Sequence, residues 1–116
     1  MEASLIRHVT ATPYPLVGRD RLKFSVLGPP RVWRGSDELD LGPAQQRLLM
    51  TLLLIHSNQP IGLSELVALM WGHEPPPSAV NLVHKYIGRL RRIAQPELPV
   101  RDQGDYILSV NGGYRL

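Results

Sequence analysis

The chain has 116 residues, of which 13 are lysine or arginine, 10 are aspartate or glutamate, 4 are histidine and none is cysteine. This length accommodates one domain of about 100 residues with a short extension, and it suffices for a hydrophobic core without disulfides. The absence of cysteine excludes a disulfide scaffold, cysteine-ligated zinc and a cysteine nucleophile, while a net charge of +3 does not by itself indicate a partner.

The apolar segments are too short to predict a membrane-spanning helix or a secretory signal. The longest covers residues 48–55 and is interrupted by Thr51, whereas a bilayer-spanning helix needs about 20 apolar residues. At the N-terminus, residues 5–6 are followed directly by Arg7, with no hydrophobic region behind it. We therefore expect a soluble, cytoplasmic protein that makes no contact with a membrane.

The first twenty residues differ in character from the rest of the chain. They show no hydrophobic period and contain Pro13, Pro15 and Gly18, residue types typical of loops and chain ends. Regular alternation of apolar and polar residues begins only after this segment. We predict a flexible N-terminal tail over residues 1–20 and a single folded domain over residues 21–116.

The start of the predicted domain has the pattern of a small antiparallel sheet. A first strand is expected over residues 22–27, where apolar and polar side chains alternate up to the apolar pair Val26-Leu27. Gly28-Pro29-Pro30 then interrupts the pattern. A second short strand is expected over residues 31–34, a turn over residues 35–38 and a third strand over residues 39–41.

Two helices are predicted after this sheet. Gly42-Pro43 marks the change, since proline suits a first helical turn, and leucines at helical spacing predict a helix over residues 44–57. Gly62 is expected to cap a second helix, with Glu65 in its first turn near the positive end of the helix dipole. The buried face of this second helix is expected to contain Leu66, Leu69 and Met70.

A third predicted helix separates an apolar face from a basic one. It follows the stiff segment of residues 75–77 and extends from about Ser78 to Ala94, before Pro96. At about 100° per residue, one stripe is apolar, and it contains Ala79, Val83, Ile87, Leu90 and Ala94. The opposite side and its flanks contain Ser78, Asn81, His84, Lys85, Gly88, Arg89, Arg91 and Arg92.

The positive charge of the chain is concentrated in this third helix. Residues 75–95 contain four basic residues and no acidic one, and the remaining nine basic and ten acidic residues of the chain sum to −1. A solvated helix face usually mixes charges of both signs. In a major groove, by contrast, arginine contacts guanine, asparagine contacts adenine and lysine neutralises phosphate. A basic surface helix without a ligand is the alternative, and charge alone does not decide between the two.

A hairpin is predicted at the end of the chain. The apolar segments of residues 106–110 and 114–116 flank Asn111-Gly112-Gly113, and an Asn-Gly pair in this setting strongly favours a hairpin. A narrow tip of this kind suits a minor groove, with Arg115 close behind it. The predicted fold class is α+β, with an N-terminal antiparallel sheet, three helices and a C-terminal hairpin.

Several segments, in this order, resemble one family of DNA-binding domains. They are Leu27-Gly28-Pro29, Leu41-Gly42-Pro43-Ala44-Gln45-Gln46-Arg47, Leu69-Met70-Trp71-Gly72, Tyr86-Ile87-Gly88-Arg89-Leu90-Arg91-Arg92 and Gly113-Tyr114-Arg115-Leu116. Over residues 21–116 the chain resembles the winged-helix domain of the Streptomyces antibiotic regulatory proteins (SARPs), which is related to the OmpR/PhoB effector domain. The resemblance implies a winged helix-turn-helix whose third helix enters the major groove.

The resemblance also implies which residues contact a partner. In the third helix, the family's DNA-facing positions correspond to Asn81, His84, Lys85 and Arg89, and its positions suited to phosphate contact correspond to Arg91 and Arg92. Ser78 and Gly88 complete the predicted DNA-binding face. Predicted wing contacts are Ser109, Asn111, Gly112 and Arg115. The loop of residues 71–77, with Trp71, His73 and Glu74, matches the loop that meets RNA polymerase in the wider family. For His84, a DNA contact and packing against the wing both stay open.

In functional terms the resemblance implies a transcriptional activator of a biosynthetic, antibiotic gene cluster. Such a protein binds direct repeats in double-stranded DNA and contacts RNA polymerase holoenzyme through its sigma or alpha subunit. We expect a cytoplasmic, nucleoid-associated monomer that pairs head-to-tail on DNA. Most SARPs continue into a helical activation domain, whereas we expect this chain to be a DNA-binding module alone. Lys85 also departs from the family, in which an apolar residue is common at that position.

No motif in the sequence predicts an enzyme. His73-Glu74 resembles the start of a metalloprotease motif, but Pro77 stands where the second histidine is required. Asp102 and Asp105 flank Gly104 in a pattern that turn formation explains. We therefore expect no catalytic activity, no metal and no cofactor. The alternative function is a winged-helix protein-interaction module whose basic face binds an acidic protein partner.

Overall fold

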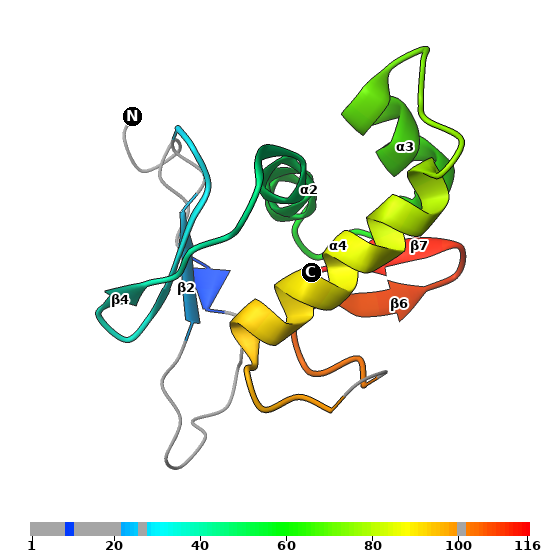
Figure 1. Cartoon of the computed structure of the whole chain (residues 1–116). Helices are drawn as coiled ribbons and strands as arrows, with labels where there is room; N and C mark the ends of the chain where they lie inside the picture. The colour runs from blue at the N-terminus through cyan, green and yellow to red at the C-terminus, as the bar shows by residue number, and fades with distance from the viewer. Residues whose placement is uncertain (1–8, 11–21, 26–27, 100–101) are drawn as a thin grey trace.

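The computed structural model describes residues 9–10, 22–25, 28–99 and 102–116 of the chain. Figure 1 shows the N-terminal strands on one side of the molecule and the helices with the C-terminal strands on the other. In chain order the elements are β1 (Val9–Thr10), β2 (Leu22–Ser25), β3 (Arg31–Arg34), β4 (Asp37–Glu38), α2 (Ala44–Ile55), β5 (Ile61–Gly62), α3 (Leu63–Trp71), α4 (Ala79–Ala94), β6 (Leu108–Val110) and β7 (Gly113–Arg115).

The N-terminal sheet has the strand order β1-β2-β3-β4, and all of its pairs are antiparallel. The third strand was predicted over residues 39–41 but lies at Asp37–Glu38, which corrects the sequence-based boundary. The reason is a tight two-residue turn: Gly35 adopts a φ of 62°, so the chain reverses at once and Arg34 pairs with Asp37. Leu41 then leaves the sheet and enters the core.

The predicted N-terminal tail of residues 1–20 is described only in part. Val9–Thr10 form β1 and pair with β2, with Val9 opposite Phe24. The other residues of this segment lie outside the described part of the chain, as do residues 26–27 at the end of the first predicted strand. The division into a tail and a domain at residue 20 therefore stays a prediction.

The first predicted helix is α2, and it ends two residues earlier than the sequence suggested. His56 forms its C-cap, and Asn58 has a φ of 68°, a left-handed conformation that asparagine tolerates better than most residues. Pro43 occupies the N-cap position rather than the first helical turn. The buried apolar residues of α2 are Leu49, Met50, Leu53 and Leu54.

The second predicted helix is α3, with Gly62 as its N-cap and Glu65 in its first turn, as predicted. Leu66 and Met70 are buried, but the prediction for Leu69 was wrong, because 48% of its surface is exposed. The packed side of α3 also includes Leu63 and Val67. Both lie on the opposite side of Leu66 from Leu69, so the packed stripe turns away from Leu69.

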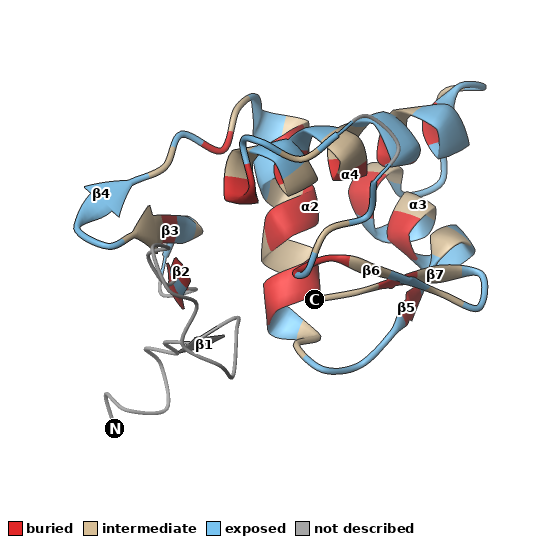
Figure 2. Cartoon of the chain, turned by 90° about the horizontal axis from the view of Figure 1, so that it is seen from below, coloured by how far each residue is buried: buried red, intermediate tan, exposed pale blue. Residues whose placement is uncertain are grey.

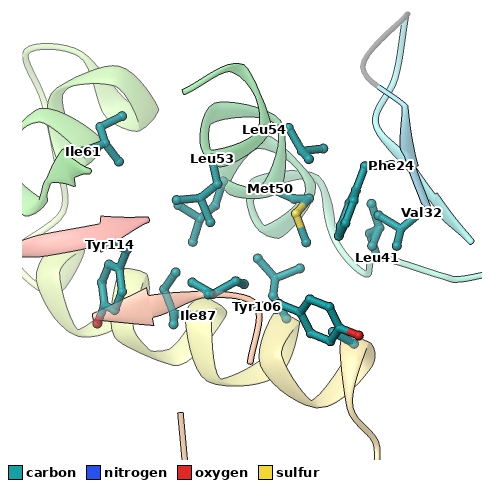
Figure 3. Packing of buried hydrophobic residues seen from close by; sticks show 14 of the residues in the cluster. Phe24, Val32, Leu41, Met50, Leu53, Leu54, Ile61, Ile87, Tyr106 and Tyr114 are labelled. Carbon is teal, nitrogen blue, oxygen red and sulfur yellow. The ribbon is translucent and has the colours of Figure 1, made fainter. Parts of the chain in front are cut away.

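The third predicted helix is α4, which begins after Ser78 and ends at Ala94, as predicted. All five residues of its apolar stripe are buried. Four of them, Val83, Ile87, Leu90 and Ala94, pack in one core with α2, the N-terminal sheet and β7. Figure 3 shows Phe24 and Val32 at one end of this core and Tyr114 at the other, with Met50 between them.

The C-terminal hairpin forms a three-stranded sheet in the order β5-β7-β6. Its two-residue turn is Asn111–Gly112, and its first strand begins at Leu108 rather than at residue 106. The third strand, β5, was not predicted from the sequence; it pairs Ile61 with Tyr114 and Gly62 with Gly113. A Cβ atom on Gly113 would lie 2.1 Å from the carbonyl oxygen of Ile61, so glycine is what allows this close approach.

Among the described residues, no helix is long and apolar enough to cross a membrane.

Candidate nucleic-acid interface

The exposed side of α4 brings the predicted DNA-facing residues together. Asn81, Lys85, Arg89 and Arg92 are exposed and Gly88 is half-buried, because the apolar stripe fixes the opposite side of the helix in the core. Ser78 is exposed at the N-cap. We call the surface formed by Asn81, Lys85, Gly88, Arg89 and Arg92 the basic face of α4.

The cations of the basic face have no acidic partner among the described residues. Within that part of the chain the structure gives one ion pair, Arg31 with Glu38 at 2.8 Å, and it lies in the N-terminal sheet. The Arg92 guanidinium donates a hydrogen bond of 3.1 Å to the carbonyl oxygen of Gly88, one turn earlier. Unpaired exposed cations on one helix face repel one another and favour an anionic partner such as phosphate.

A shallow hollow extends along this face. It is lined by Gln46, His84, Lys85, Gly88, Arg89, Arg92 and Ile93. Gln46 contributes from α2, where it is buried and donates from Nε2 to the carbonyl oxygen of Leu41 at 2.9 Å. Gln46 was not predicted as a site residue, because a glutamine between Gln45 and Arg47 carries no signal in the sequence that it will be buried.

Arg91 points away from the basic face and contacts the wing. Its Nε and Nη2 atoms donate to the carbonyl oxygen of Ile107 at 2.9 and 2.8 Å, and Nη2 also donates to Ser109 Oγ at 3.1 Å. The guanidinium lies 5.6 Å from the centre of the Tyr114 ring. Burial lowers the pKa of Arg91, and Tyr114 partly opposes this shift. Arg91 therefore joins α4 to β6, and its predicted contact with phosphate stays a prediction.

His84 also contacts the wing. Its Nδ1 atom shares a hydrogen bond with the Tyr114 hydroxyl, and the two rings meet edge to face with centroids 5.9 Å apart. Burial raises the pKa of Tyr114, and the nearby Arg91 partly opposes this shift. Of the two roles left open for His84, packing against the wing is observed. The imidazole is still exposed, so its contact with DNA stays a prediction.

The predicted wing residues occupy different places on the hairpin. Asn111 and Gly112 form the exposed turn, and Ser109 is exposed on β6, whereas Arg115 is half-buried on β7. Figure 2 shows this turn exposed at the rim of the molecule. The carbonyl oxygen of Gly112 accepts a 2.8 Å hydrogen bond from the backbone N–H of Leu63, so the turn is attached to the start of α3.

The predicted polymerase loop connects α3 to α4. Trp71 is half-buried and packs against the core, while His73 and Glu74 are exposed. Gly72 ends α3 with a φ of 67°, which turns the chain outward. Within the described part of the chain, no group of three histidine, aspartate or glutamate residues is arranged to hold a metal ion.

Comparisons with known proteins agree with this architecture. Residues 36–116 match the family described as "Transcriptional regulatory protein, C terminal". The chain is 39% identical over 97 residues to the regulatory protein AfsR of Streptomyces griseus. The aligned region covers 84% of this chain and 10% of AfsR. The chain is 25% identical over 95 residues to the transcriptional regulator RedD of Streptomyces coelicolor, covering 82% of this chain and 27% of that protein.

A solved structure has the same fold. EmbR of Mycobacterium tuberculosis, in complex with a low affinity phosphopeptide, superposes with a TM-score of 0.75 at 29% sequence identity. The superposition covers 84% of this chain and 25% of that one. This chain spans between about a tenth and about a quarter of the length of these relatives. The chain thus belongs to the transcriptional regulators with an OmpR/PhoB-type winged-helix domain, and among them to the SARP family of DNA-binding regulators.

Proposed function

We propose that the chain binds a specific double-stranded DNA sequence, with α4 in the major groove and the β6–β7 wing at the minor groove. The observation that supports this most is the basic face of α4, which has three exposed cations and no acidic partner among the described residues. A helix of this width fits the major groove of B-form DNA. The exposed Asn111–Gly112 turn is narrow enough for the minor groove.

The residues of the basic face would divide their roles by position. Asn81 and Arg89 carry the side chains that distinguish adenine and guanine by paired hydrogen bonds. Arg92 lies in the last turn of α4, where the guanidinium suits a phosphate contact. Lys85 also suits phosphate, as a compact charge with three donors.

At the level of the whole regulator, we propose an activator of a biosynthetic, antibiotic gene cluster that acts at the nucleoid in the cytoplasm. The chain would pair head-to-tail on direct repeats and contact RNA polymerase through the loop of residues 71–77. The exposure of His73 and Glu74 supports the contact with polymerase. Sedimentation with and without operator DNA tests the pairing, and a stable dimer without DNA would contradict it.

The experiment for DNA binding uses Arg89→Ala, with Arg31→Ala as a control that removes the same charge from the N-terminal sheet. The probe is a duplex that the parent protein selects from a random DNA library. We expect Arg89→Ala to weaken specific binding by about 1–3 kcal/mol and to relax the preference at one base pair. Arg31→Ala should bind as the parent does.

Binding is measured by fluorescence anisotropy between 50 and 200 mM salt. If Arg89→Ala binds the selected duplex as tightly as Arg31→Ala, the proposed orientation of α4 is wrong. If the parent shows no salt-dependent binding to any duplex, the basic face serves an acidic protein partner instead, which is the alternative function.

A further inference from the structure

The C-terminal end of α4 is held by a side chain from the N-terminal sheet. The Nη2 atom of Arg34, on β3, donates to the carbonyl oxygens of Ile93 and Ala94, and both distances are 2.8 Å. Arg34 is half-buried, and it is separated from these acceptors by about sixty residues of chain. The contact thus connects two parts of the fold that are distant in sequence.

The chemistry of this contact matches what a helix end requires. The last four carbonyl groups of a helix have no partner within the helix, and they carry the negative end of its dipole. No glycine follows α4: Gln95 is the C-cap, and Pro96 stands at the next position, where a left-handed cap needs glycine or asparagine. A charged donor with two short hydrogen bonds therefore supplies the cap that the local sequence lacks.

A second contact holds the same end of the helix. The Gln95 side chain donates from Nε2 to Asp105 at 3.1 Å and accepts at Oε1 from the Asp105 backbone N–H at 2.8 Å. Gln95 is buried. The C-terminal turn of α4 is thus fixed by β3 and by the loop that leads to the wing.

This end of α4 carries two of the three cations of the basic face. Arg89 and Arg92 lie in the last two turns, within five residues of the carbonyls that Arg34 caps. Side chains that contact bases and phosphates must be held within about 0.5 Å of their productive positions, and supporting residues provide this precision. Loosening of the last turn would therefore displace Arg92 and weaken the support of Arg89 one turn earlier, while the rest of the helix stays packed.

We propose that Arg34 is a positioning residue for DNA binding, through which the N-terminal sheet braces the DNA-contacting end of α4. This inference depends on the proposed function of α4. Arg34 lies outside residues 36–116, which match the family. The DNA-binding unit thus includes β3 as well as the helices and the wing.

The test compares Arg34→Ala, Arg34→Lys and Arg31→Ala on the selected duplex. Arg31 is a matched control, because it lies on the same strand and carries the same charge but is exposed and paired with Glu38. We expect Arg34→Ala to weaken binding about three- to tenfold at each salt concentration, as loss of a charged cap at a helix end implies. Arg34→Lys should restore part of the affinity, and Arg31→Ala should match the parent.

Two readouts separate positioning from direct contact and from general destabilisation. The slope of log affinity against log salt should stay at the parent value in Arg34→Ala, since a lost phosphate contact lowers it by about one unit. Without DNA, amide hydrogen exchange should quicken in residues 92–95 of Arg34→Ala and stay unchanged in α2.

Several outcomes would overturn the brace. The first is equal DNA affinity of Arg34→Ala and Arg31→Ala. The second is a slope of log affinity against log salt that falls by about one unit in Arg34→Ala. The third is unchanged amide hydrogen exchange in residues 92–95 of Arg34→Ala. Exchange that quickens throughout α2 would also overturn it, because the variant would then be globally less stable. The exchange experiment contains no DNA, so it tests the brace even if the proposed orientation of α4 on DNA fails.

Discussion

Arg91 and Arg92 are neighbours of the same residue type on α4, and the structure predicts opposite consequences for their removal. Arg91→Ala deletes three hydrogen bonds to the wing and leaves the carbonyl of Ile107, a fully buried residue, without this donor. Hydrogen bonds from charged groups contribute about 1.5–3 kcal/mol each, and an acceptor left unsatisfied costs about 1–3 kcal/mol. Because Ser109 is exposed and Arg91 only half-buried, we expect a total loss of about 2 kcal/mol in the free energy of unfolding.

Arg92→Ala is the matched control for stability. Among the described residues, its side chain hydrogen-bonds only to Gly88 within the same helix. Because this side chain is also exposed, the unfolding free energy should change by less than about 0.5 kcal/mol. On DNA the order reverses, since Arg92→Ala should lower the slope of log affinity against log salt by about one unit. Urea unfolding, followed by tryptophan fluorescence and circular dichroism, measures the stability of both variants.

Equal stability of Arg91→Ala and Arg92→Ala would contradict this role of Arg91. If Arg91→Ala and Arg92→Ala unfold at the same urea concentration with the same m-value, the bonds between Arg91 and the wing do not stabilise the fold. The helix–wing junction would then depend on the core packing of Tyr114 and on its contact with His84.

Two further predictions concern the wing sheet. Gly113→Ala should lower the free energy of unfolding by about 1–3 kcal/mol, because its Cβ atom would meet backbone atoms of β5. Gly62→Ala is the control: its Cβ atom has open space, so the loss should be less than about 1 kcal/mol. Equal losses for the two variants in urea unfolding would refute this prediction. Burial raises the pKa of Tyr114, so its contribution to stability is present below pH ~10 and is lost as the pH rises through the folded-state pKa. Tyr114→Phe should reduce this alkaline loss, and identical stability profiles for variant and parent between pH 8 and 11 would contradict it.

The elements that sequence analysis predicted best are those with many periods of a regular pattern. α4 has sixteen residues, and the five positions of its apolar stripe agree on one buried direction, so its limits and its exposed face follow from the sequence. Strands of two residues have no period at all, which is why β5 was not predicted. The third strand was displaced because the turn at Gly35, rather than the leucines after it, determines where pairing resumes.

The burial of single side chains next to a helix stripe was harder to predict. Leu69 is as apolar as Leu66, yet which of the two is buried depends on where α2 and α4 lie around α3. Likewise, the contact between His84 and Tyr114 joins residues thirty positions apart, and that of Arg91 with Ile107 joins residues sixteen apart. These contacts depend on how the wing packs against α4, which no local pattern contains.

The contact between helix and wing changes what the charge of α4 means for DNA binding. The sequence assigns four cations to this helix, but Arg91 is held by Ile107 and Ser109, so three exposed cations form the basic face. Each phosphate neutralised contributes about −0.9 to the slope of log affinity against log salt. If each of the three cations neutralises one phosphate, the slope is no steeper than about −2.7. A steeper slope for one bound copy would have to come from other parts of the molecule, such as Arg115 on the wing. A slope twice as steep on a duplex with two direct repeats would instead indicate two copies bound side by side.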